Sequence, residues 1–141
     1  MKFEDVHKQA TEDLKIDKFD LSGEALRGPN IFSKYLGLFR DEKLILRKYE
    51  NEANILYLAK WEYYSGKASD DVYAEHPFDK KILRQDMDVY LNADQDIIAS
   101  VDKIVAQKEK VAYLERVVKY TESRNYAIST ALNFQKFTQG T

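Results

Sequence analysis

The amino-acid sequence predicts an all-α protein, and two repeating patterns carry that prediction. Apolar and aromatic side chains recur at gaps of three and four residues over residues 32–63, which is the spacing of one face of an α-helix. Between residues 97 and 118 they recur at strict intervals of seven, as along the seam between packed helices. At 141 residues the chain is long enough to bury a core, either as one compact unit or as one protomer of an assembly.

The first pattern predicts one helix of about 34 residues, roughly 50 Å long at 1.5 Å per residue. It should begin after Gly28-Pro29-Asn30, where Asn30 can cap it. It should end at Ser65-Gly66, because glycine suits the left-handed position that closes a helix. The apolar stripe consists of Phe32, Tyr35, Leu36, Phe39, Leu46, Tyr49, Ala53, Leu56 and Tyr63.

The flanking segments give shorter elements. Near the start, three turns of helix fit the side chains of Phe3, Val6, His7, Ala10 and Leu14. Residues 16–21 alternate more like a strand or an extended arm, although the all-α assignment is kept for the whole region. Residues 67–77 are rich in Ser, Asp and Glu and predict a mobile surface loop. A short helix is expected over residues 80–91, after which Asn92 or Asp94 caps the next helix.

The second pattern forms a coiled-coil-like seam through Ile97, Ile104, Val111 and Val118. An amphipathic C-terminal stretch that contains Leu132 and Phe134 is too short to be stable alone and is expected to dock. These six residues are candidates for self-association. The alternative, that the seam packs within the chain against the helix of residues 31–64, is equally open. The chain is thus divided into an N-terminal helical region (1–67), an acidic loop (68–78) and a C-terminal helical region (79–141).

Several classes of function are excluded by what the sequence lacks. There is no cysteine, so neither a disulfide framework nor a thiolate metal site is available. The five glycines form no phosphate-binding motif, and no cofactor is expected. The pairs Asp86/Asp88 and Asp94/Asp96 are poor metal ligands, because residues two apart on a helix point away from each other. With no apolar run of 18 residues and no signal-peptide stretch, we expect a cytosolic protein.

Charge is unevenly distributed behind a formal net charge of −2. Residues 68–102 carry nine acidic and three basic side chains, whereas residues 103–141 carry seven basic and three acidic ones. Such segregation allows a basic face for phosphate on a near-neutral protein. On charge alone, the ordinary charge of solvated helix faces is the favoured explanation, and the segregation needs a second signal to matter.

The end of the long helix offers the chemistry that single-stranded nucleic acid requires. Such binding needs cations for the phosphates and aromatic faces for the bases, each stacked base contributing about 1–3 kcal/mol. Both types occur close together in Lys60, Trp61, Tyr63, Tyr64 and Lys67. The competing interpretation is that the tyrosines and the tryptophan pack in the core while the lysines are simply exposed.

The run Leu58-Ala59-Lys60-Trp61-Glu62-Tyr63-Tyr64-Ser65-Gly66-Lys67 resembles the signature of the UvsY recombination mediators of T4-like bacteriophages. Two further stretches match that family, Leu91-Asn92-Ala93-Asp94-Gln95-Asp96 and Ser123-Arg124-Asn125-Tyr126-Ala127-Ile128. By this resemblance Lys60 falls on a basic position linked to DNA binding. Leu58 departs from the family pattern, which has a second basic residue there; Lys67 or Lys48 could compensate.

The resemblance implies a small accessory protein without enzymatic activity that acts in the cytoplasm of the infected host. Its partners would be single-stranded DNA, a UvsX-type recombinase, the phage single-strand-binding protein and further copies of itself. It would load the recombinase onto DNA covered by the binding protein and stabilise the resulting filament. A closed ring of six or seven protomers would add up weak, salt-dependent sites. The alternative is a helical protein–protein adaptor, in which Trp61 and Tyr64 anchor a partner.

Overall fold

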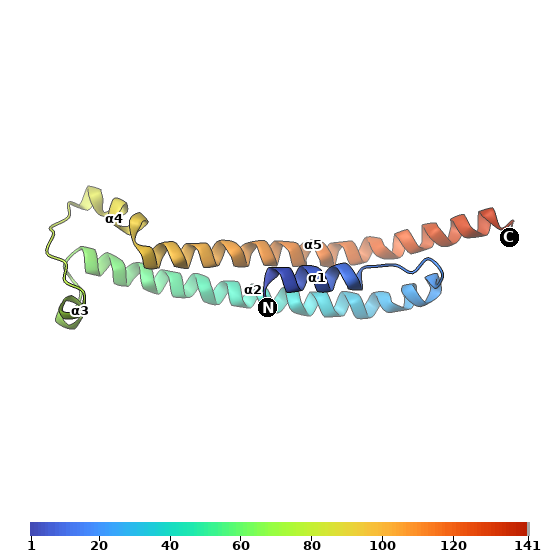
Figure 1. The fold of residues 1–141 in the computed structure, drawn as a ribbon, viewed down its shortest axis with the longest axis horizontal. Coiled ribbons are helices and arrows are strands. Elements are labelled where there is room, and N and C mark those ends of the chain that lie inside the picture. The colour runs from blue at the N-terminus through green and yellow to red at the C-terminus, as the bar shows by residue number, and fades with distance from the viewer. Residues whose placement is uncertain (141) are drawn as a thin grey trace. The chain divides into compact units, whose positions relative to one another are not determined.

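The computed structural model describes residues 1–140, which form helices and no strand, so the predicted all-α class is confirmed (Figure 1). The elements are α1 (Phe3–Asp13), α2 (Leu21–Tyr64), α3 (Asp70–Glu75), the 3-10 turn η1 (Arg84–Asp86), α4 (Met87–Ala93) and α5 (Gln95–Thr138). None of the helices in this part of the chain is long and apolar enough to cross a bilayer. The chain divides into two compact units, which are described separately below.

Unit 1 contains residues 1–43 and the described residues from Glu109 onward. Helix α1 packs here with the first half of α2 and the second half of α5, and these three segments share an apolar core. The fully or nearly fully buried members of that core are Val6, Ala10, Ile31, Tyr35, Leu114 and Val117. The predicted N-terminal helix is therefore confirmed, and it docks through Val6 and Ala10.

A buried ion pair accompanies the apolar core of unit 1. The guanidinium of Arg124 is inaccessible to solvent and donates from Nη2 to a carboxylate oxygen of Glu24 at 2.6 Å and from Nη1 to the backbone carbonyl of Glu24 at 2.8 Å. Arg27 donates to the other carboxylate oxygen at 2.8 Å. Buried charge is tolerated only when it is paired in this way.

Unit 2 contains residues 44–108 and has a different core. Tyr63 and Tyr64 at the end of α2 meet three rings from the following segment, Tyr73, Phe78 and Tyr90, with centroid separations between 5.2 and 5.8 Å. These five rings are called the aromatic cluster below. Met87 and Leu91 of α4, the helix that carries Tyr90, are buried. The end of α2 is thus closed by residues that follow it within about 30 positions.

Helix α2 begins at Leu21 rather than after Asn30, which corrects the predicted boundary. Asp20 caps it, since its Oδ1 accepts the backbone N–H of Gly23 at 3.2 Å. Pro29 lies inside the helix, although proline removes one backbone hydrogen bond. The preceding residue, Gly28, is close to α5, because a Cβ on it would lie 3.1 Å from the Asn125 side chain.

Three further boundaries differ from prediction. The expected loop of residues 67–77 contains the short helix α3. The helix expected over residues 80–91 begins only at Met87, after the η1 turn. The C-terminal amphipathic stretch is not a separate element, because α5 runs without interruption from Gln95 to Thr138.

Candidate nucleic-acid interface

The segment predicted to bind nucleic acid forms the last turn of α2 and the glycine stop after it. Gly66 has φ +80, a left-handed conformation that favours glycine. The backbone N–H of Lys67 donates to the carbonyl of Glu62 at 2.8 Å, and that of Gly66 to the carbonyl of Tyr63 at 3.3 Å. This pair of bonds closes the helix in the Schellman pattern, so the predicted stop at Ser65-Gly66 is confirmed.

Tyr73 of α3 holds the same turn from outside the helix. Its hydroxyl donates to the backbone carbonyl of Tyr63 at 2.8 Å and accepts the backbone N–H of Ala68 at 3.3 Å. The ring of Tyr73 also stacks on the ring of Tyr63, with centroids 5.6 Å apart and planes at 20°. One side chain therefore satisfies backbone groups on both sides of the glycine stop.

Tyr63 and Tyr64 belong to the aromatic cluster and are not free platforms. The Tyr63 hydroxyl donates to the carbonyl of His76 at 3.1 Å, and its ring contacts Tyr64, Tyr73 and Phe78. Both tyrosines are half-buried. The structure thus uses these two predicted DNA-binding residues to close unit 2.

Lys60 is ion-paired with the start of α5. Its Nζ lies 3.2 Å from Asp94 Oδ2 and 2.7 Å from Asp96 Oδ2, and its side chain keeps only 22% of its accessible surface. Asp94 also accepts the Tyr64 hydroxyl at 2.6 Å through Oδ2 and the backbone N–H groups of Asp96 and Ile97 through Oδ1. Asp94 is therefore the predicted cap of α5, and it carries Lys60 and Tyr64 as additional partners.

The titration of this group follows from these contacts. Burial alone would raise the pKa of Asp94, but hydrogen bonds from Tyr64, the Ile97 amide and Lys60 outweigh burial and lower that pKa. Burial alone would lower the pKa of Lys60, and its hydrogen bonds to Asp96 and Asp94 raise it instead. Burial and the hydrogen bond to Asp94 both raise the pKa of the Tyr64 hydroxyl. All three groups are thus held in the charge state that the network needs at neutral pH.

Three of the predicted residues remain at the surface. Lys67 is exposed and its Nζ lies 5.0 Å from the centre of the half-buried Trp61 ring, a cation–π contact. Lys48 keeps 71% of its side-chain surface, and its Nζ lies 4.0 Å from Glu52 Oε1, a long ion pair. An exposed pair at that distance contributes little to stability. Of the three predicted cations, Lys67 and Lys48 are therefore exposed, whereas Lys60 is engaged in ion pairs.

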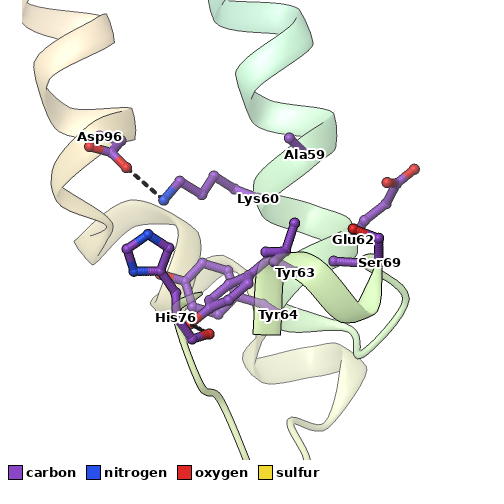
Figure 2. Close-up of a pocket in the computed structure, with 10 residues that line it drawn as sticks. Ala59, Lys60, Glu62, Tyr63, Tyr64, Ser69, His76 and Asp96 are labelled. Carbon is purple, nitrogen blue, oxygen red and sulfur yellow. Dashed lines mark hydrogen bonds and ion pairs between the residues drawn. The ribbon is translucent and has the colours of Figure 1, made fainter. Parts of the chain in front are cut away.

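A pocket of about 540 Å³ opens beside these residues, between the end of α2, α3 and the start of α5 (Figure 2). Its lining includes Lys60, Tyr63, His76 and Asp96, and Figure 2 shows Lys60 reaching across to Asp96. Among the residues that the structure describes, no group of three or more His, Asp or Glu side chains could hold a metal ion.

Sequence reasoning missed the partners of Lys60. Asp94 and Asp96 were expected to point apart, as residues two apart on a helix do. Their carboxylates instead converge on one ammonium, because Asp94 is the non-helical cap with φ −69 and ψ 125 while Asp96 lies in the first turn of α5. The available signal was the capping prediction for Asp94, which already placed it outside the helix.

The candidate self-association residues divide by exposure. Ile97, Ile104, Val111, Val118 and Leu132 are half-buried within the protomer, and Phe134 keeps 66% of its surface. Val118 packs against the core of unit 1. Six residues of α5 are buried, and four of them form a neighbouring row seven apart, made of Gln107, Leu114, Thr121 and Ile128; the other two are Val117 and Arg124. Self-association through the predicted residues stays a prediction.

Comparisons with known proteins connect this geometry to a family. A family model described as "Recombination, repair and ssDNA binding protein UvsY" matches residues 9–141. The chain is 23% identical to "Recombination protein uvsY" of Enterobacteria phage T4 over 140 residues, which is 99% of each chain.

Solved structures resemble the fold. Two crystal forms of the bacteriophage T4 recombination mediator protein UvsY give TM-scores of 0.86 and 0.85, each at 22% identity. The first alignment covers 97% of this chain and 99% of that one, and the second covers 99% and 98%. At this identity the likeness establishes a shared fold.

Proposed function

The chain belongs to the UvsY family of recombination, repair and single-stranded-DNA-binding proteins, and from that premise we propose that it is a recombination mediator. It binds single-stranded DNA, loads a UvsX-type recombinase onto DNA covered by the phage single-strand-binding protein, and stabilises the filament that results. It acts without catalysis, in the cytoplasm of the infected host. The family match over residues 9–141 is the observation that carries this proposal.

The single-stranded DNA contacts the exposed residues at the C-terminal end of α2. Trp61 and Lys67 place a ring and a cation 5.0 Å apart, which is the pairing that base stacking and phosphate attraction require. Lys48 lies earlier on the same helix and adds an exposed cation. Tyr63 and Tyr64 hold this end of α2 in place, because their rings and hydroxyls are engaged within unit 2.

A ring of six or seven copies supplies the affinity that one protomer lacks. The proposed binding residues of one protomer include only two exposed cations, Lys48 and Lys67, so a single site binds weakly, and linked sites gain through effective concentration. In this proposal residues 1–67 carry the DNA-binding segment, the segment 68–78 connects, and residues 79–141 supply self-association. Phe134, exposed near the end of α5, is the most accessible of the proposed contact residues.

A protein–protein adaptor is the second candidate, and exposed apolar rows in unit 2 favour it. Leu44, Ile55 and Leu58 of α2 keep 58–71% of their surface, and Ile98, Val101 and Val105 of α5 keep 37–50%. Exposed apolar surface of this kind marks contacts with other proteins. The two functions differ in salt dependence, because phosphate binding weakens steeply with salt whereas apolar contacts barely respond.

The test is to follow Trp61 fluorescence during titration with oligo-dT, single-stranded and as a duplex, over a series of salt concentrations. Trp61 is the sole tryptophan, so a change reports on the proposed DNA contact. We expect quenching by the single strand that weakens as salt rises. An absence of both quenching and binding at low salt would contradict the mediator function and favour the adaptor.

A further inference from the structure

Lys60 is surrounded by acidic groups in a way that keeps phosphate from it. Its ammonium contacts Asp94 at 3.2 Å and Asp96 at 2.7 Å. A phosphate oxygen that reached the same ammonium would approach both carboxylates at contact distance, and the repulsion between like charges grows as the separation falls. Asp96 keeps 68% of its side-chain surface, so a negative charge faces solvent beside Lys60.

Lys67 provides the contrast within the same unit. Its side chain is exposed, and it has no ion-pair partner among residues 1–140. Its ammonium lies over the Trp61 ring instead. A phosphate can therefore contact Lys67 without displacing a carboxylate.

The contacts of Lys60 show what it does instead. It neutralises Asp94, the residue that caps α5 and accepts the Tyr64 hydroxyl at 2.6 Å. Asp94 is only 7% exposed, and a buried carboxylate without its cation is strongly disfavoured. Lys60 thereby joins the last turn of α2, which carries Trp61, to the first turn of α5.

We propose that Lys60 acts in single-stranded DNA binding as a positioning residue, which holds the last turn of α2 against Asp94 and Asp96 and makes no phosphate contact. This inference rests on the proposed function. The phosphate contacts belong to exposed cations beyond the turn, with Lys67 first among them.

The experiment measures how the affinity for oligo-dT depends on salt, by fluorescence anisotropy of a labelled oligonucleotide, with the full chain. Two matched pairs of variants are compared: Lys60→Met with Lys67→Met, and Asp96→Asn with Asp102→Asn. Asp102 is an exposed α5 residue outside the ion-paired group, so its variant reports the general effect of losing one negative charge. Helical circular dichroism and sedimentation establish that each variant keeps its fold and assembly.

A positioning role predicts that Lys60→Met lowers affinity several-fold and leaves the slope of log K against log salt as in the wild type. Lys67→Met should reduce that slope by about 0.7 for each phosphate that the variant no longer neutralises. Asp96→Asn should bind several-fold more weakly than Asp102→Asn, because the ion-paired group is loosened although a negative charge has been removed.

Opposite results overturn the inference. If Lys60 held phosphate, Asp96→Asn would remove one of the two carboxylates that compete with phosphate for its ammonium, and this variant would bind more tightly than Asp102→Asn, with a steeper slope. Equal binding by these two variants, or a slope lowered by Lys60→Met as much as by Lys67→Met, also overturns it. If Lys60→Met fails to fold, the aspartate pair still decides, since Asp94 remains to hold Lys60 in Asp96→Asn. A wild-type protein that does not bind the oligonucleotide contradicts the proposed function itself.

Discussion

The charged network around Arg124 and Glu24 in unit 1 and the one around Lys60 in unit 2 differ in how much water reaches them. In unit 1, Arg124 is inaccessible and its partner Glu24 keeps 8% of its side-chain surface. In unit 2, Lys60 keeps 22% and Asp96 keeps 68%. Burial strengthens charge interactions and also makes an unpaired charge costly. The network of unit 1 is therefore part of the core, whereas in unit 2 only Asp94 is buried, and we expect a perturbation of the unit 2 network to cost less stability.

The comparison predicts the largest effect at Arg124. Arg124→Ala should lower the free energy of unfolding by about 3–5 kcal/mol, because it leaves the Glu24 carboxylate buried beside a cavity. Denaturant unfolding at fixed protomer concentration measures this. Arg116→Ala, at an exposed position of the same helix, serves as the control. The double variant Arg124→Met/Glu24→Gln should cost less than Arg124→Ala, because it leaves no buried carboxylate and a smaller cavity. A loss below about 1 kcal/mol for Arg124→Ala would show that the deeper burial of the unit 1 network does not make it more important for stability.

The apolar core of unit 1 gives the next effect. Leu114 is inaccessible to solvent, so Leu114→Ala should cost about 2–5 kcal/mol through reduced burial and a residual cavity. Leu26→Ala makes the same chemical change at a position that is 80% exposed, and should cost no more than about 0.5 kcal/mol. Similar losses for both variants in thermal or denaturant unfolding would contradict the assignment of the core.

Hydrogen bonds from tyrosine to aspartate occur in both units and allow a closer comparison. Tyr64→Phe removes the donor to Asp94, and Tyr35→Phe removes the donor to Asp13 at 2.7 Å. Hydrogen bonds to charged groups contribute about 1.5–3 kcal/mol. Tyr35 is fully buried and Tyr64 half-buried, so we expect the larger loss for Tyr35→Phe. The reverse order in denaturant unfolding would show that unit 2 depends more on its polar network than exposure suggests.

The smallest predicted effect is on the stability of the fold at acidic pH. Burial alone would raise the pKa of Asp94, but in the folded protein its hydrogen bonds to Tyr64, Ile97 and Lys60 lower that pKa. The unfolded chain then takes up this proton first, so the stabilisation is present above the unfolded pKa of about 3.9 and is lost as pH falls below it. Asp94→Asn should flatten the decline in stability below about pH 4.

Asp13 in unit 1 also has a lowered pKa in the folded protein. Burial alone would raise that pKa, but the hydrogen bonds with Lys34 and Tyr35 outweigh burial. Asp13→Asn should therefore remove a separate part of the acid sensitivity. Circular dichroism in denaturant from about pH 2 to pH 6, a range that spans the unfolded pKa of aspartate, measures both variants. An unchanged pH profile in Asp94→Asn would mean that its contacts do not stabilise the ionised form.

The sequence predicted the features that depend on nearby residues. The first helix, the stop at Gly66 and the cap at Asp94 follow from local periodicity and from the chemistry of helix ends. The predicted start of α2 was wrong, because the buried face of its first turns includes Glu24 and Gly28, which do not look apolar. These two positions are explained only by Arg124 and Asn125, about 100 residues away in the sequence.

The same limit applies to the candidate site. Its residue types were found from one run of ten residues, but their roles depend on Asp94, Asp96 and the rings of the aromatic cluster. Residue types alone did not distinguish Lys60 from Lys67, and the family resemblance assigned the DNA-binding position to Lys60. Their different surroundings follow from the turn between α4 and α5, which brings residues more than 30 positions apart into contact.

The discontinuity of unit 1 has a consequence for the order in which the chain folds during synthesis. Its first part, residues 1–43, leaves the ribosome well before its second part, which begins at Glu109. At 5–20 residues per second the intervening residues take about 3–13 s to be made. Val6, Ala10 and Ile31 lack Leu114 and Val117 throughout that interval. Unit 2 is contiguous, so its native contacts are complete as soon as residue 108 has emerged. The nascent chain therefore exposes one apolar surface for seconds, which is where a chaperone or a neighbouring nascent chain would bind.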